Sequence, residues 1–140
     1  MAEGFIKVCV CPIGAENCLT TSNCPEMPPF AQARLSTDSN KRKEMPVASG
    51  CVDYFPDALT AVAELSWHGN NKHNPGQPLH WSRAKSSDHA DCIMRHFIER
   101  GTVDTDGIRH SVKVAWRALA LLQEELEAAN GLPPSRGSRA

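Results

Sequence analysis

The stretch IRHSVKVAWRALALLQEELEAANG, residues 108–131, is the longest periodic segment of the sequence. Its apolar side chains recur at alternating spacings of four and three, which places them along one side of an α-helix. Asn130-Gly131 and Pro133 are typical stop signals, so we expect a helix over about 107–130. The spacing is also typical of helices that pack along one another at a shallow angle. The apolar positions are Ile108, Val112, Ala115, Leu119, Leu122 and Leu126.

Two shorter helices are predicted before this segment. The first covers about 56–68, because Pro56 suits the first helical position and Gly69 is a common helix-ending residue. The second covers about 87–100 and ends before Gly101. Its apolar positions follow the helical period, and they are Ala90, Ile93, Met94, Phe97 and Ile98.

These segments predict a mainly α fold with a three-helix core and long loops. Residues 1–46 differ in composition, because Phe5–Cys11 alternates like a short β-strand and prolines with polar residues follow. We therefore divide the chain into an N-terminal extension (1–46), a helical domain (47–130) and a flexible tail (131–140). Three helices make a thin core, which favours a homo-oligomer, at least a dimer.

Length and charge exclude several classes of protein. The chain has 140 residues, the length of one ordinary domain. Fifteen Lys and Arg residues against sixteen Asp and Glu residues give a net charge of −1, whereas proteins that bind duplex nucleic acid usually carry a basic excess. No apolar run approaches the roughly 18 residues that span a bilayer, and the first residues lack the features of a secretory signal. We expect a cytoplasmic protein that binds neither duplex nucleic acid nor membrane.

Four cysteines lie close together near the N-terminus: Cys9, Cys11, Cys18 and Cys24. In a reducing compartment they are not expected to form disulfides. Four thiolates can bind zinc, but zinc sites typically use C-x2–4-C pairs, and the spacing here is C-x-C-x6-C-x5-C. Ordinary reduced cysteines are therefore favoured, with zinc as the alternative.

A long polar connection, residues 69–86, joins the first two predicted helices. Long connections in compact domains often have a function. This one combines cations, amides, histidines and an aromatic ring, which suit phosphates, base edges and base stacking. The alternative is an ordered surface loop whose Pro and Trp residues pack over the core. The candidate nucleotide-binding residues are Lys72, His73, Asn74, His80, Trp81, Arg83 and Lys85.

Carboxylates near the second helix indicate a magnesium site. Asp88 and Asp91 offer hard oxygen ligands, and Glu64 of the first helix completes the metal set, with Glu64 and Asp91 as the catalytic pair. The alternative is structural, with Asp88 as N-cap and Asp91 paired to Arg95. At about 100° per residue, Asp91 and His96 lie roughly 140° apart around the helix, so they are not expected to share one ion.

Further cations on the second and third helices complete the candidate set. Those on the third helix form a stripe that can grip phosphate if the loop of an oligomer partner lies against it. The alternative is a solvated face. The acidic residues 124–127 are expected on the surface. The additional candidate nucleotide-binding residues are Arg95, His96, His110, Lys113 and Arg117.

Several strings of the region are specific as family markers. They are Asp53-Tyr-Phe-Pro-Asp-Ala-Leu59, His73-Asn-Pro-Gly-Gln-Pro-Leu-His-Trp81, Lys85-Ser-Ser-Asp-His-Ala-Asp91, Arg95-His96, Asp104-x-Asp-Gly-x-Arg-His110 and Lys113-Val-Ala-Trp-Arg117. Over roughly 50–127 the chain resembles phage and prophage proteins that carry the "dATP/dGTP diphosphohydrolase, N-terminal" domain. The resemblance implies purine deoxynucleotides and a phage setting, and hence the cytoplasm of a host.

In the family's namesake this domain accompanies a MazG-like pyrophosphohydrolase domain with EExxE and ExxD motifs, whose carboxylates hold magnesium. Glu124-Glu-Leu-Glu127 departs from EExxE, and the only counterpart of ExxD is Asp88-x-x-Asp91. The sequence therefore leaves two hypotheses about the function. The resemblance favours a magnesium-dependent dATP/dGTP diphosphohydrolase that releases monophosphate and pyrophosphate. The alternative is a non-catalytic oligomeric sponge that sequesters a nucleotide or a defence second messenger.

Overall fold

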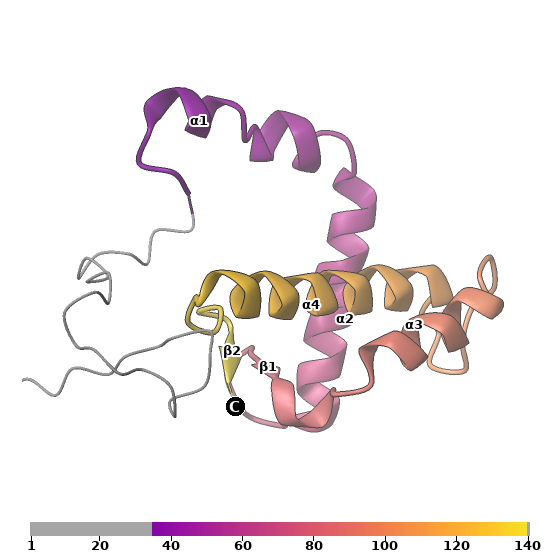
Figure 1. Cartoon of the computed structure of the whole chain (residues 1–140). Helices are drawn as coiled ribbons and strands as arrows, with labels where there is room; N and C mark the ends of the chain where they lie inside the picture. The colour runs from indigo at the N-terminus through magenta and orange to yellow at the C-terminus, as the bar shows by residue number, and fades with distance from the viewer. Residues whose placement is uncertain (1–34, 140) are drawn as a thin grey trace, which may run out of the picture. The chain divides into compact units, whose positions relative to one another are not determined.

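The computed structural model describes residues 35–139 and confirms the mainly α fold (Figure 1). The strand expected at Phe5–Cys11 and the cysteines expected to be reduced or zinc-bound lie outside the described residues. No helix within 35–139 is long and apolar enough to cross a bilayer. In chain order the elements are α1 (Ser39–Lys43), a π-helical turn (Ala48–Val52), α2 (Pro56–His73), β1 (Trp81–Ser82), a 3-10 turn (Arg83–Lys85), α3 (His89–Ile98), α4 (His110–Asn130) and β2 (Ser138–Arg139).

Helix α2 begins at Pro56, as predicted, but runs one turn past the expected end at Gly69. A glycine inside a helix costs about 1 kcal/mol relative to alanine. The added turn carries Asn70, which is buried and bonds the loop that follows. Its Oδ1 accepts the His80 backbone N–H (3.3 Å), and its Nδ2 donates to the Gln77 carbonyl (3.1 Å). These hydrogen bonds offset the free-energy cost of the glycine. They cannot be predicted from the periodicity of the sequence.

Helix α3 is shorter than expected and packs on α4 through a different face from the predicted apolar stripe. Its buried residues are His89 and Cys92. Met94, Phe97 and Ile98 of the predicted stripe are exposed instead. The two buried residues of α3 are therefore one polar and one apolar side chain, and Ile93 is the member of the predicted stripe that is partly buried.

Helix α4 crosses α2 and lies beside α3 (Figure 1). It starts at His110 rather than near 107 and ends at Asn130 as predicted, with Gly131 in the left-handed conformation (φ 58°). The buried position in its middle is Ala120, whereas Leu119 of the predicted seam is half exposed. Adjacent residues are about 100° apart around a helix, so the packed face lies beside the leucine seam rather than on it.

The segment after α4, expected to be a flexible tail, pairs with the loop before α3 in this structure. Strands β1 and β2 are parallel, and the Trp81 N–H donates to the Gly137 carbonyl (2.8 Å). Arg83 joins the two segments as well. Its Nε donates to Ser138 Oγ (2.9 Å) and its Nη2 to Ser135 Oγ (3.3 Å).

Glu127 is the anion that meets Arg83, and it is buried rather than on the surface as expected. Arg83 Nη1 lies 2.8 Å from Glu127 Oε2, and Gln123 Nε2 donates to Oε1 (2.6 Å). Burial alone would raise the pKa of Glu127, but the hydrogen bonds from Arg83 and Gln123 outweigh it and hold the pKa below its ordinary value of 4.5. The ion pair therefore stabilises the fold when Glu127 is ionised.

Arg83→Ala should lower the free energy of unfolding by about 3 kcal/mol, because the buried carboxylate of Glu127 loses its charged partner and keeps neutral donors such as Gln123. Urea denaturation followed by circular dichroism measures this change. Since the pKa of Glu127 is lower in the folded state, its contribution is present above pH 4.5 and is lost as the pH falls through the folded pKa. Glu127→Gln should therefore flatten the acid side of the stability profile, whereas the exposed control Glu125→Gln should not. Equal profiles for the two variants would contradict the role of this pair.

We propose that a second copy of the chain covers the apolar side chains that α3 and α4 leave exposed. Light scattering should then give a mass of at least twice 15.3 kDa. Leu122→Glu should shift the protein toward the monomer, because a charge is costly in an apolar interface. Val47→Glu, at an exposed apolar residue outside α3 and α4, is the matched control. A wild-type monomer at micromolar concentration would rule the proposal out. The exposed residues are Met94, Phe97, Ile98, Leu119, Leu122 and Leu126.

Candidate functional site

A cleft of about 840 Å³ is lined by α2, α3, α4, the loop 74–86 and the C-terminal segment. This volume is within the range of small-molecule sites. Many of the residues proposed from the sequence meet in it: Lys72, His73, Asn74, His80, Trp81, Lys85, His96, Lys113 and Arg117. The other candidates lie outside its lining: Glu64, Arg83, Asp88, Asp91, Arg95 and His110. The structure thus assembles most of the predicted polar loop around one cavity.

Asn74 and His80 shape the loop rather than offering free polar groups. Asn74 Oδ1 accepts a hydrogen bond from Lys85 Nζ (3.0 Å), and its Nδ2 donates to Asn70 Oδ1 (3.3 Å). His80 Nδ1 donates to the Pro78 carbonyl (2.8 Å). The contacts of these two residues therefore agree with the alternative of an ordered surface loop.

Two lysines of the cleft have no carboxylate partner among residues 35–139. Lys72 lies exposed in the last turn of α2. Lys85 is also exposed, and its Nζ donates to the His73 carbonyl (2.6 Å) and to the Asn74 side chain. Both of these partners are neutral, so the positive charges of the two lysines remain available to an anion.

Lys113, in contrast, is neutralised within the chain. Its Nζ lies 2.6 Å from Asp104 Oδ2 and 2.6 Å from Asp106 Oδ2. The hydrogen bond from Lys113 is the main reason why the pKa of each of these aspartates is lowered. Asp106 is the one carboxylate in the cleft lining among the described residues. Lys113 therefore adds little net charge to the cleft.

Arg95 and Arg117 share a single aspartate. Arg95 Nη2 donates to Asp88 Oδ2 (2.6 Å), and Arg117 Nη1 lies 3.5 Å from Asp88 Oδ1. The hydrogen bond from Arg95 lowers the pKa of Asp88. Asp88 is the N-cap residue of α3, as the structural alternative proposed, but its side chain makes no capping hydrogen bond. Arg95 pairs with Asp88 rather than with Asp91.

Trp81 is part of an aromatic cluster and not a free stacking platform. Its ring centroid lies 5.8 Å from that of Trp116 and 5.9 Å from that of His89. Its indole N–H donates to Ser86 Oγ (2.9 Å). The Arg83 guanidinium lies 4.4 Å from the ring centroid and occupies one face. The expectation that this ring stacks a base is weakened, because its own chain already uses that face.

The predicted magnesium set is not assembled in this structure. Asp88 is held by two arginines, Asp91 is exposed on α3, and Glu64 lies on α2 with its Oε1 3.7 Å from His68 Nε2. Glu64 lines a separate, smaller cavity of about 300 Å³. The three carboxylates do not form a group of close ligand atoms within the described part of the chain. The spacing of residues in the sequence predicts neither how α3 is rotated about its axis nor that Arg95 and Arg117 form ion pairs with Asp88.

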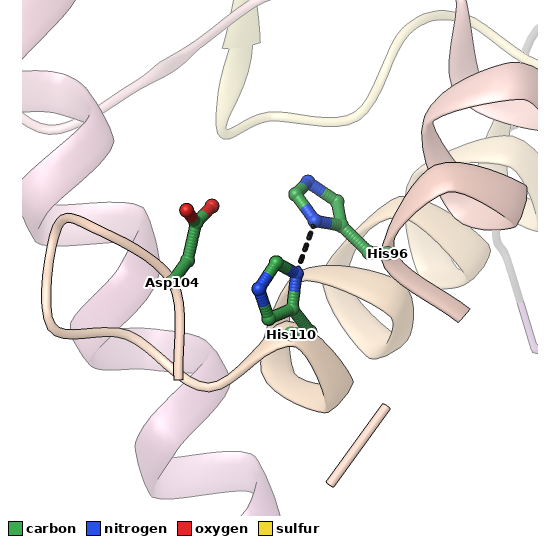
Figure 2. Close-up of side chains that lie close together, drawn as sticks. All are labelled: His96, Asp104 and His110. Atoms are coloured by element: carbon green, nitrogen blue, oxygen red, sulfur yellow. Dashed lines mark hydrogen bonds between the residues drawn. The ribbon is translucent and has the colours of Figure 1, made fainter. Parts of the chain in front are cut away.

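A different cluster does bring ligand-type atoms together: His96, Asp104 and His110 (Figure 2). His96 Nδ1 and His110 Nδ1 are 2.9 Å apart, and His110 is buried. Burial, followed by the positive charge of Lys113, lowers the pKa of His96 below 6.5. Both histidines were predicted from the sequence as nucleotide ligands, but Asp104 was not, because no spacing rule joins it to them. Two segments that meet only in the folded chain supply the three side chains.

Comparison with known proteins places the chain in a family. A model of the family described as "dATP/dGTP diphosphohydrolase, N-terminal" matches residues 36–131, which is more than half of the sequence. The match includes all of α2, α3 and α4 and most residues of the cleft. Searches of curated proteins and of solved structures find no match. The chain therefore belongs to the dATP/dGTP diphosphohydrolase N-terminal domain family.

Proposed function

We propose that this chain binds a purine deoxynucleoside triphosphate in the cleft and holds it without hydrolysing it. The family's description names dATP and dGTP, and the cleft has a volume suited to a ligand of that size. The observation that carries the proposal is the pair Lys72 and Lys85, which line the cleft without a carboxylate partner among the described residues. A triphosphate is the type of ligand that such charges favour, because charge-assisted hydrogen bonds are the strong ones.

Arg117, on α4, is a third cation of the cleft that favours a phosphate-bearing ligand. It lines the cleft, and its guanidinium lies 5.6 Å from the centroid of the Trp116 ring. Asp88 neutralises it only in part, because that carboxylate also accepts the shorter bond from Arg95. Arginine suits phosphate because its planar fork offers several donors to neighbouring oxygens. Cations from two helices and a loop thus border one cavity.

Binding without turnover fits the carboxylates better than magnesium-dependent hydrolysis does. A magnesium site that acts on a phosphate chain uses carboxylates together with the phosphates. Within the described residues, the cleft lining offers only Asp106, which is bound to Lys113. Glu64, Asp88 and Asp91 lie outside the lining. The residues present therefore do not fit a magnesium centre, and the hydrolytic function rests on the family's description alone.

Lys85→Ala should weaken the binding of dATP or dGTP by about 1–3 kcal/mol, because one charge-assisted phosphate contact is lost. Calorimetry in the presence of EDTA measures the affinity without any contribution from metal. Lys41→Ala, at a residue of α1 outside the cleft lining, is the matched control and should bind like wild type. Unchanged affinity in both Lys85→Ala and Lys72→Ala would place the ligand elsewhere.

Incubation with dATP or dGTP and Mg²⁺ should leave the nucleotide intact. Ion-pair chromatography after denaturation of the protein separates the triphosphate from the monophosphate and pyrophosphate. Lys85→Ala, purified in the same way, controls for a contaminating hydrolase. Monophosphate and pyrophosphate formed by wild type but not by this variant would contradict the proposal and restore the enzyme.

A further inference from the structure

We propose that His96, Asp104 and His110 form a binding site for a transition-metal ion of the zinc type. The site differs from the predicted magnesium set in residues, place and chemistry, and it does not rest on the proposed nucleotide function. Figure 2 shows the two imidazole rings and the carboxylate turned toward a common space. Each residue offers one ligand atom, and these atoms all lie within 4.8 Å of one another.

The distance between the two imidazole nitrogens is close to what a metal requires. His96 Nδ1 and His110 Nδ1 are 2.9 Å apart. Two nitrogens bound to one tetrahedral zinc at 2.0–2.1 Å are roughly 3.3 Å apart. A shift of a few tenths of an ångström in the half-buried His96 ring would accommodate the ion. Rotation of a whole element is not needed.

The two facing nitrogens can hold either a hydrogen bond or a metal ion between them. A neutral imidazole has one donor and one acceptor nitrogen, so without an ion one ring donates its Nδ1–H to the other, and with both rings deprotonated at Nδ1 the two lone pairs face one ion. Water has little access to the His110 ring, which is only 5% exposed, whereas His96 lines the cleft. Imidazole nitrogen with carboxylate oxygen is a donor set that zinc and related ions accept, whereas Mg²⁺ prefers oxygen alone.

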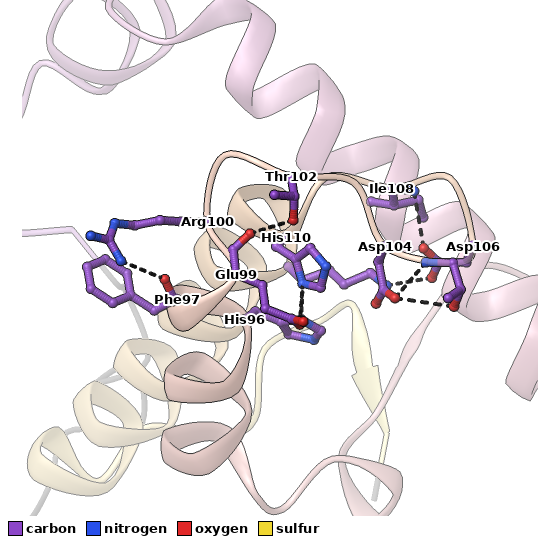
Figure 3. A network of polar contacts seen from close by, with 11 residues as sticks. His96, Phe97, Glu99, Arg100, Thr102, Asp104, Asp106, Ile108 and His110 are labelled. Atoms are coloured by element: carbon purple, nitrogen blue, oxygen red, sulfur yellow. Dashed lines mark hydrogen bonds and ion pairs between the residues drawn. The ribbon is translucent and has the colours of Figure 1, made fainter.

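The backbone holds these ligands in place without an ion. The turn between α3 and α4 is closed by bonds from the Asp104 N–H to the Ile108 carbonyl (2.9 Å) and from the His110 N–H to the Thr102 carbonyl (3.2 Å). Gly107 supplies a positive φ of 81° within it. Figure 3 shows how this turn brings Asp104 and His110 beside His96 at the end of α3. A preorganised ligand set binds with less ordering cost.

Carboxylates outnumber lysine among the groups that contact the cluster. Asp104, Asp106 and Glu99 carry three negative charges against the one positive charge of Lys113. Besides burial, Lys113 and Arg95 act on His96 in the opposite sense and lower its pKa. Lys113 binds Asp104, but a carboxylate oxygen has more than one lone pair and can also contact an ion. Glu99 Oε2 lies 3.5 Å from His110 Nδ1 and is a further carboxylate oxygen beside the cluster (Figure 3). Three ligands with an open fourth position are the arrangement of a zinc ion that can still bind a small molecule.

The test uses the full chain, freed of metal with a chelator and then titrated with Co²⁺, a coloured substitute for zinc. We expect one ion per chain, visible absorption bands of low-symmetry coordination, and displacement of Co²⁺ by Zn²⁺. Thiolate-to-cobalt bands in the near ultraviolet should be absent, because no cysteine belongs to this site. This readout separates the site from the cysteines near the N-terminus.

His96→Ala should weaken Zn²⁺ binding by roughly 100-fold or more, since loss of an outer-shell partner alone costs 10–100-fold. Asp104→Asn should weaken it as well, and it keeps a hydrogen-bond acceptor for Lys113, so that folding survives. His68→Ala, which removes an exposed imidazole beside Glu64, is the matched control and should bind like wild type. Circular dichroism checks that each variant is folded.

Two results would overturn the site. One is the absence of Co²⁺ and Zn²⁺ binding by wild type at micromolar concentration. The other is stoichiometric binding that persists in folded His96→Ala and Asp104→Asn but is lost in the double variant Cys9→Ser, Cys11→Ser, which would assign the metal to the thiols.

Discussion

The guanidinium of Arg83 holds three parts of the fold together. It lies over the ring of Trp81, forms an ion pair of 2.8 Å with Glu127, and donates to Ser138 in the C-terminal strand. One cation therefore joins the loop after α2, helix α4 and the end of the described chain. Lysine, as a compact point charge, does not reproduce this geometry, because the contacts require a planar fork with several donors. Arg83 and Lys85 belong to the same 3-10 turn, and Lys85 lines the cleft. The contacts of Arg83 therefore also position this part of the cleft wall.

A polar interior is the second feature of this molecule. Cys92 and Ala120 are the buried apolar residues in the described chain, and polar side chains fill the remaining buried positions. Buried polar groups fix neighbouring elements through directed hydrogen bonds, whereas leucines that would add apolar burial lie half exposed on α4. His89 Nε2 is buried without a hydrogen bond among the described residues, with Glu124 at 3.6 Å. Such a monomer gains less from the hydrophobic effect than its composition allows, which is why a second copy on the exposed face is physically reasonable.

Charge pairing separates the cations that build the protein from those that face a ligand. Arg83, Arg95 and Lys113 each have a carboxylate within 2.8 Å. Lys72 and Lys85 have none within the described residues, although both lie in the same cleft. The amino-acid types alone do not distinguish these groups, because the distinction depends on which anion the fold brings near. The same is true of His96 and His110, because the fold brings them beside Asp104 and so places three metal-ligand atoms close together.

Local sequence patterns predicted the three longer helices, the start of α2 at Pro56, the end of α4 before Gly131 and the polar loop that lines the cleft. These features are local, because helical periodicity, capping and stop signals act over a few residues. Local patterns did not predict α1, because Ser39–Lys43 lies in the segment interpreted as an extension of loop and linker. Long-range packing sets which face of α3 and α4 is buried, places Glu127 in the interior, and keeps Glu64, Asp88 and Asp91 apart. Arg83 and Ser138 are 55 positions apart, and contacts of that range leave no periodic trace in a single sequence. Burying a charge such as that of Glu127 is costly unless an opposite charge lies beside it. Arg83 meets this requirement only because the folded chain brings the two residues together.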